Sequence, residues 1–164
     1  MSYYDGVIPE LKKLAEERGL IFEPSPKPGF EWLLDIEASP GKRSFFSLEG
    51  TDSGVVGVIS IPALDREHSS KAWNRIEPPQ KYKLQRLEWN GYGGKKVVFA
   101  LLQIWEEERA SVLIPLQELF KLKVFKDKGN FTVKKDGRDF CLVTPRGDSP
   151  IMLRTGIEKV FTLL

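Results

Sequence analysis

Apolar residues near the start of the chain recur with the spacing of an α-helix. Leu11, Leu14 and Ala15 fall on one helical face, whereas their neighbours in the sequence are charged. These charged residues are Lys12, Lys13, Glu16 and Glu17. Asp5 can cap such a helix by accepting hydrogen bonds from its first free backbone N–H groups, and Gly19 can end it. The pattern therefore predicts a helix between Asp5 and Gly19.

Runs of β-branched and aromatic residues follow, and proline and glycine separate them. Residues 55–61 form the most β-branched run and predict a central strand, and the continuous apolar run at 97–102 predicts a strand buried on both faces. The other predicted strands are residues 20–22, 30–36, 44–48, 110–114, 131–133 and 140–143. Pro78 and Pro115 each open a predicted helix. These elements predict one α/β or α+β domain over residues 1–164, with a mixed central sheet flanked by helices.

Composition excludes several classes of protein. A chain of 164 residues with four Trp, four Tyr and ten Phe can bury a sizeable core. No apolar run approaches the roughly 20 residues of a membrane span, and the first residues lack a secretory signal, so we expect a cytoplasmic protein that does not contact membranes. With one cysteine, Cys141, and one histidine, His68, an internal disulfide and a structural zinc site are excluded. Carboxylates would have to hold any metal, which favours Mg or Mn.

Charge is distributed unevenly, although the net charge is only +2. Residues 65–96 carry eight basic and four acidic side chains, and residues 121–138 carry seven and two. Residues 1–40 and 97–120 are net acidic. Two basic stretches can hold a polyanion if the fold brings them to one face, and the alternative is that they only solvate exposed surface.

Carboxylates flank the predicted central strand. Asp52 precedes it within Thr-Asp-Ser-Gly, and Asp65 and Glu67 follow it. Such carboxylates can bind one Mg²⁺, which would activate a water and neutralise a scissile phosphate. The alternative for Asp52 is a turn residue that hydrogen-bonds its own backbone.

Other chemistry is excluded or has a simpler interpretation. His68 lies beside two serines but no Gly-x-Ser-x-Gly turn occurs, which excludes the usual nucleophilic triads. The glycine-rich residues 91–94 follow a predicted helix and precede a strand, the reverse of the order in a phosphate-binding loop. The acidic residues 106–108 are interpreted as solubilising a hairpin.

The order of several features resembles a known nuclease superfamily. The chain has a charged first helix at 10–20, Thr-Asp-Ser-Gly at 51–54, a Gln-x-x-x-Leu motif at 80–84, and a Gly-Gly turn at 93–94 that leads into an apolar strand. Over residues 7–122 this order resembles the PD-(D/E)XK nuclease superfamily, and within it the Holliday-junction resolvases of the bacterial RecU and archaeal types.

The resemblance implies a restriction-endonuclease-like fold and a role in DNA recombination or repair. Residues 30–48 correspond to a projecting insertion that engages the junction centre, and residues 123–164 form a C-terminal extension. Because such resolvases are symmetric dimers, the resemblance also implies a homodimer that binds four-way junctions.

The resemblance also assigns site residues. Asp52 matches the family's metal-binding aspartate, and Gln80 belongs to the matching helix motif. Glu10, Glu16 or Glu17 matches the acidic residue on the first helix, and Glu17 is taken as the candidate metal ligand. The family's catalytic Glu-x-Lys is absent, since the matching place, residues 62–64, reads Pro-Ala-Leu. A metal ligand and a cation are thereby lost, and each such contribution commonly accounts for about 10²–10³ in rate. We therefore expect a lost or impaired nuclease centre, which needs no cofactor.

An active enzyme with relocated residues is the alternative. Asp65 or Glu67 would supply the missing ligand and Lys71 the missing cation, next to Asp52 and Glu17, with Mg or Mn as cofactor. A second alternative is a scaffold for a protein partner on a nuclease fold. For DNA binding, we expect phosphate contacts from these residues: Lys42, Arg43, Arg66, Lys71, Arg75, Lys81 and Lys83.

Overall fold

The computed structural model describes residues 2–23, 44–50, 54–63, 97–115, 118, 131–143 and 149–164. In these ranges the chain forms one α-helix, eight strands and a short 3-10 helix. They are α1 (Tyr3–Glu17), β1 (Ile21–Glu23), β2 (Ser44–Gly50), β3 (Gly54–Pro62), β4 (Val97–Trp105), β5 (Ala110–Pro115), β6 (Thr132–Asp136), β7 (Asp139–Val143), β8 (Ile151–Thr155) and η2 (Ile157–Leu163). The predicted strand at 30–36 and the predicted helix after Pro78 lie outside the described residues. Of the helix predicted after Pro115, only Glu118 is described, and it is helical.

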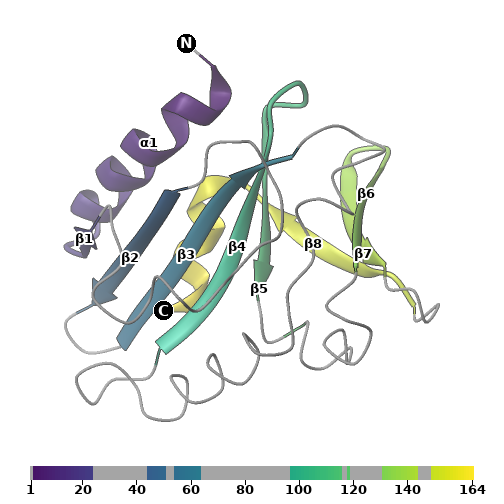
Figure 1. Ribbon diagram of the computed structural model, residues 1–164. Coiled ribbons are helices and arrows are strands. Elements are labelled where there is room, and N and C mark those ends of the chain that lie inside the picture. The colour runs from purple at the N-terminus through teal and green to yellow at the C-terminus, as the bar shows by residue number, and fades with distance from the viewer. Residues whose placement is uncertain are drawn as a thin grey trace.

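The eight strands form one sheet in the order β1-β2-β3-β4-β5-β8-β7-β6 (Figure 1). Among the described strands, β3 and β4 are the one parallel pair, and all other neighbours are antiparallel. Parallel neighbours require a long crossover, which residues 64–96 supply in the sequence. The fold is therefore α+β with a mixed, mostly antiparallel sheet. A strand overlaps each of the seven predicted positions that are described: 20–22, 44–48, 55–61, 97–102, 110–114, 131–133 and 140–143.

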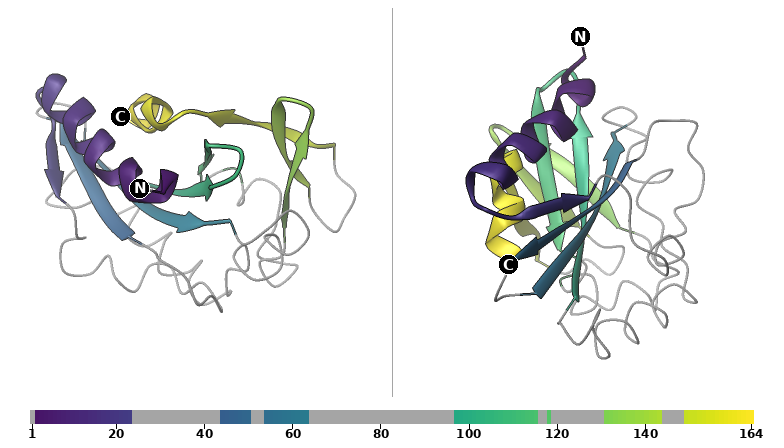
Figure 2. Two further views of the ribbon diagram at one scale, coloured as in Figure 1. Left: turned by 90° about the horizontal axis from the view of Figure 1, so that it is seen from above. Right: turned by 90° about the vertical axis from the view of Figure 1, so that its left-hand side faces the viewer.

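α1 covers one face of the sheet with an apolar stripe. Tyr4, Val7, Leu11 and Ala15 are buried on this stripe, as the spacing of the predicted helix requires. η2 packs on the same face through Val160, and Figure 2 shows both helices on one side of β3 and β4. The strands contribute these buried side chains to the same core: Phe46, Leu48, Val56, Val58, Ala100, Leu102, Ile104 and Leu113.

β4 is buried on both faces, which confirms the prediction from its continuous apolar run. Successive side chains of a strand point to opposite faces, so Leu101 and Trp105 lie on the face away from α1. Both are nevertheless buried, like Leu102 and Ile104 on the α1 face. The Trp105 ring packs against Phe140 of β7, with ring centroids 5.2 Å apart.

The predicted start of the first helix is wrong by several residues. Ser2 is the N-cap, and its hydroxyl accepts a hydrogen bond of 3.2 Å from the backbone N–H of Asp5, which lies within the first turn. The backbone N–H groups of Tyr3 and Tyr4 are satisfied by the carboxylate of Glu106, a residue from the turn between β4 and β5. A distant part of the chain thus allows the helix to begin earlier. Neither α1 nor η2, the helices of the described ranges, is long and apolar enough to cross a membrane.

Candidate functional site

Most of the site residues expected from the sequence lie outside the described part of the chain. Glu17 is the exception, and it is the exposed last residue of α1. The candidate catalytic and metal-binding residues outside the described ranges are Asp52, Asp65, Glu67, Lys71 and Gln80. The candidate DNA contacts outside them are Lys42, Arg43, Arg66, Arg75, Lys81 and Lys83.

One end of the sheet gathers segments that are far apart in the sequence. α1 ends at Glu17, four residues before Ile21 begins β1 beside the end of β2. Gly50, the last residue of β2, is the register partner of Gly54, the first residue of β3. In Figure 1 the end of β2 and the start of β3 lie at the lower left, and the C-terminal end of α1 lies above them beside β1. The pairing of β1 with β2 therefore brings Glu17 toward the end of the sheet where Asp52 joins Gly50 to Gly54 in the sequence.

The length of β3 separates the two groups of carboxylates expected to share a metal ion. β3 has nine residues, and at about 3.3 Å per residue its ends lie roughly 26 Å apart. Asp52 precedes one end, and Asp65 and Glu67 follow the other. Because Mg²⁺ holds its oxygen ligands at only about 2.1 Å, one ion could contact both groups only if a flanking segment returned along the strand. The same length separates Asp52 from residues 62–64, the place that the resemblance assigns to Glu-x-Lys.

β3 itself contains no ionisable residue. Its sequence is Gly-Val-Val-Gly-Val-Ile-Ser-Ile-Pro, and residues two apart on a strand share a face. A Glu-x-Lys pair would occupy two such positions, yet every pair available on β3 is neutral. Glu-x-Lys is therefore absent from the whole of β3 as well as from residues 62–64.

Neutral polar groups meet instead where α1 begins. The hydroxyl of Tyr4 lies 3.4 Å from the hydroxyl of Ser44 and donates to the backbone carbonyl of Ser60 at 3.5 Å. The hydroxyl of Ser60 donates to the backbone carbonyl of Ser44, also at 3.5 Å, and Ser60 is buried. These hydrogen bonds join the start of α1 to β2 and β3 of the sheet.

Acidic side chains do not converge in the described part of the chain. No group of three or more His, Cys, Asp or Glu residues is arranged there to hold a metal ion. Residues 106–108 form the turn between β4 and β5, as expected for a hairpin, but Glu106 also caps α1. That role was not predicted, because nothing local in the sequence links Glu106 to a helix about a hundred residues earlier.

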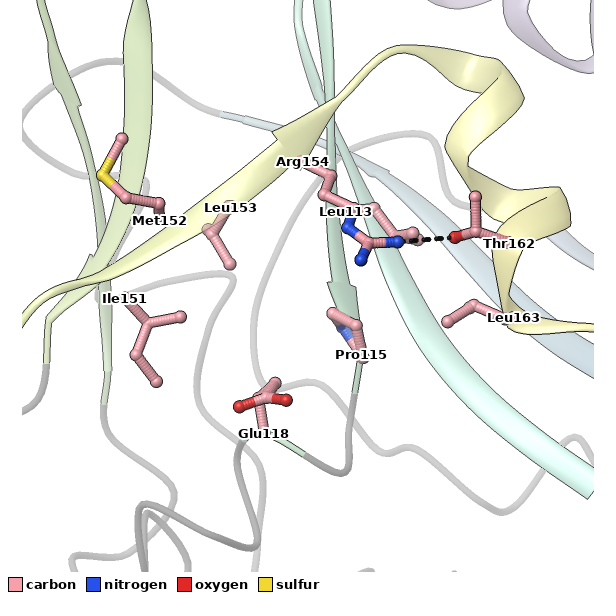
Figure 3. Close-up of a pocket in the computed structure, with 9 residues that line it drawn as sticks. All are labelled: Leu113, Pro115, Glu118, Ile151, Met152, Leu153, Arg154, Thr162 and Leu163. Atoms are coloured by element: carbon pink, nitrogen blue, oxygen red, sulfur yellow. Dashed lines mark hydrogen bonds between the residues drawn. The ribbon is translucent and has the colours of Figure 1, made fainter.

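A cavity of about 400 Å³ lies between β5, β8 and η2 (Figure 3). The guanidinium of Arg154 donates a hydrogen bond of 3.1 Å to the hydroxyl of Thr162 at its rim, and Figure 3 shows Glu118 on the opposite side. The other lining residues are Leu113, Pro115, Ile151, Met152, Leu153 and Leu163. Six of the nine described lining residues are apolar, and the other three supply one cation, one carboxylate and one hydroxyl. Such a lining can hold a small amphiphilic group.

The second basic stretch is partly described, as the hairpin formed by β6 and β7. Lys134 and Lys135 lie on β6 and Arg138 lies in the turn, and all three side chains are exposed. They were part of the basic segment found in the sequence but were not among the expected DNA contacts. The signal that could have identified them is the excess of basic residues, seven against two acidic ones, in residues 121–138.

Comparisons of the chain with protein-family models, with curated proteins and with solved structures gave no match. The PD-(D/E)XK resemblance therefore stays a prediction from the sequence. The fold itself is an α+β domain with a mixed, mostly antiparallel sheet.

Proposed function

We propose that this protein binds DNA, including four-way junctions, through a PD-(D/E)XK-like fold whose metal-dependent nuclease centre is lost. It would act in recombination or repair, as a homodimer matched to the two-fold symmetry of a junction. The observation that carries the proposal is that β3, an interior strand of the sheet, contains no ionisable residue.

The order of elements supports the nuclease-like frame. A helix, α1, precedes three antiparallel strands, and a long crossover segment then leads to β4, which is parallel to β3. A mixed sheet with a helix on its face is what the resemblance implies. The pairing of β1 with β2 brings the end of α1, with Glu17, toward the end of the sheet where β2 stops and β3 starts, and Asp52 lies between these two strands in the sequence.

The chemistry of β3 supports the loss of catalysis. Hydrolysis of a phosphodiester by a metal-dependent nuclease requires a metal to activate water and a cation to offset the charge of the phosphate. Without the Glu and the Lys of the motif, two contributions are missing, and one alone is commonly worth about 10²–10³ in rate. Asp65 and Glu67 follow the end of β3 in the sequence, next to the place of the missing Glu-x-Lys, and they remain the candidates of the alternative with relocated residues.

The distribution of charge supports DNA as the partner. Basic residues gather in 65–96 and 121–138, whereas residues 1–40, which include α1, are net acidic. DNA attracts such basic segments because its phosphates carry one charge per about 1.7 Å of duplex. A protein held in this way loses affinity steeply as salt rises.

A cleavage assay and a binding assay on one labelled four-way junction test this function. With Mn²⁺ we expect the junction to remain intact on a denaturing gel, and with the same sample we expect a complex whose affinity falls with salt. Cleavage that disappears with EDTA and in Asp52→Ala would overturn the lost centre and support relocated catalysis by Asp65, Glu67 and Lys71. An intact junction without binding at low salt would overturn the DNA-binding function and leave the role of a protein scaffold.

A further inference from the structure

The β6–β7 hairpin lies at one margin of the sheet, far from α1. β6 is the last strand in the sheet order, with β7 as its neighbour, whereas α1 contacts β1 at the other margin. Both figures of the whole chain show the hairpin and α1 at opposite ends of the molecule. The hairpin is therefore an element whose surface can be altered without touching the core beneath α1.

Buried aromatic and aliphatic side chains hold the base of the hairpin in place. Four side chains at the base are at most 3% exposed: Phe131 just before β6, Val133 on β6, and Phe140 and Leu142 on β7. Phe140 packs on Trp105 of β4, which fixes the hairpin to the centre of the sheet. A base of this kind orders the hairpin before any ligand binds, so binding does not have to supply the ordering free energy.

The outer part of the hairpin is open and cationic. Lys134 pairs with Cys141 and Lys135 pairs with Phe140, and the two lysines project from opposite faces of β6. Gly137, with φ +64°, forms the two-residue turn with Arg138, and no atom lies within 4 Å of the place where a Cβ on Gly137 would be. The three basic side chains are exposed and thus surround a turn with free space.

The carboxylates of the hairpin do not cancel these cations. Asp136 and Asp139 are register partners at the rung next to the turn, with the lysines before them and Arg138 between them in the sequence. The hairpin therefore retains one excess positive charge.

We propose that the β6–β7 hairpin is a contact site for the phosphate backbone of DNA, with Lys134, Lys135 and Arg138 as the contacting residues. This proposal rests on the proposed DNA-binding function and adds an element that the nuclease resemblance does not include. A two-stranded β-ribbon fits the major groove of DNA, which is about 12 Å wide. Lysines on both faces of such a ribbon can reach the phosphates that border the groove on either side. Flexible exposed lysines contact phosphates rather than base edges, so the site is indifferent to sequence.

The experiment compares two matched double variants. Lys134→Gln/Lys135→Gln removes two charges from the hairpin, and Lys12→Gln/Lys13→Gln removes two charges of the same kind from the exposed face of α1. Affinity for a duplex and for a four-way junction is measured by fluorescence anisotropy at several salt concentrations. Because all four lysines are exposed, we expect both variants to keep the unfolding temperature of the unaltered protein.

We expect the hairpin variant to bind about tenfold more weakly at 0.15 M salt and to reduce the slope of log K against log salt by about two, since each phosphate contact contributes about 0.9. Arg138→Gln should reduce the same slope by about one. Lys134→Arg/Lys135→Arg keeps both charges, and it should bind DNA with the affinity of the unaltered protein. The α1 variant should also bind with that affinity. Equal effects of the two double variants, or no effect of the hairpin variant, would overturn the hairpin site while the DNA-binding function stands. Absence of binding by the unaltered protein would overturn both.

Discussion

The carboxylate of Glu106 accepts a hydrogen bond of 2.6 Å from the backbone N–H of Tyr3, a residue 103 positions earlier in the chain. Its second oxygen accepts from the backbone N–H of Tyr4 at 2.9 Å. The first backbone N–H groups of a helix have no partner within the helix, and the helix dipole favours a negative charge beside them. The Ser2 hydroxyl accepts from the backbone N–H of Asp5, so Ser2 and Glu106 together provide acceptors for the first backbone N–H groups of α1. Glu106 also fixes the start of the helix to the turn between β4 and β5.

Removal of this carboxylate should destabilise the protein. Glu106→Ala leaves the N–H groups of Tyr3 and Tyr4 without their partner, so we expect the free energy of unfolding to fall by about 1–2 kcal/mol. Glu107→Ala, in the same turn and exposed, should change it by less than about 0.5 kcal/mol. Urea denaturation measures both, and equal effects of the two substitutions would show that the cap contributes nothing.

A second link between α1 and the sheet is the hydrogen bond of 2.8 Å between the hydroxyls of Tyr3 and Ser111. Ser111 is fully buried, so Tyr3→Phe deprives a buried hydroxyl of a partner. We expect a loss of about 1–2 kcal/mol in the free energy of unfolding. A double-mutant cycle with Ser111→Ala isolates the interaction, because the second substitution should cost little once the first is present. Additive losses in the cycle would contradict a direct bond.

The apolar stripe of α1 should dominate the stability of the helix on the sheet. Leu11 is fully buried, and Leu11→Ala removes a side chain that the surroundings can replace only in part. We expect a loss of about 2–5 kcal/mol, against less than about 0.5 kcal/mol for Lys12→Ala on the exposed face. Urea denaturation again supplies the measurement. A loss below about 1 kcal/mol for Leu11→Ala would mean that α1 does not depend on this core.

The basic stretch at 65–96 gives a prediction about DNA binding. We expect log K to fall linearly with log salt, and Arg75→Glu to weaken binding and to lower the slope. Lys13→Glu on the exposed face of α1 is the control, since it makes the same change in net charge at a site outside the basic stretches. Fluorescence anisotropy with a labelled junction measures both variants. Affinity that does not depend on salt would count against contact with phosphates.

Much of the fold is predictable from periodicity because local patterns report burial directly. The helical spacing of Leu11 and Ala15 reflects a stripe that must face a core, and the unbroken apolar run of β4 reflects burial on both faces. The alternation at β6 and β7 and the β-branched run of β3 act in the same way. These elements carry the information in their own side chains.

Other parts of the fold depend on distant contacts and leave little local signal. β8 shows partly buried and exposed residues without a clear alternation, because it pairs at one end with β5 and at the other with β7, and it was not predicted. η2 is held on the α1 face by Val160 and was not predicted either. The same applies to the cavity between β5, β8 and η2, whose walls are joined only in the folded chain.

The sequence by itself determined the composition of the candidate site, including the absence of Glu-x-Lys after the central strand and the basic stretches. Spatial relations were decided only by the tertiary structure. The pairing of Gly50 with Gly54 and of β1 with β2 brings the end of α1, with Glu17, toward the end of the sheet where β2 stops and β3 starts. The sequence predicts that Glu106 is a surface residue of a hairpin. It caps α1 because the fold brings the β4–β5 turn next to Tyr3. Periodicity reports which side chains are buried, whereas strand register and direction decide which of them meet.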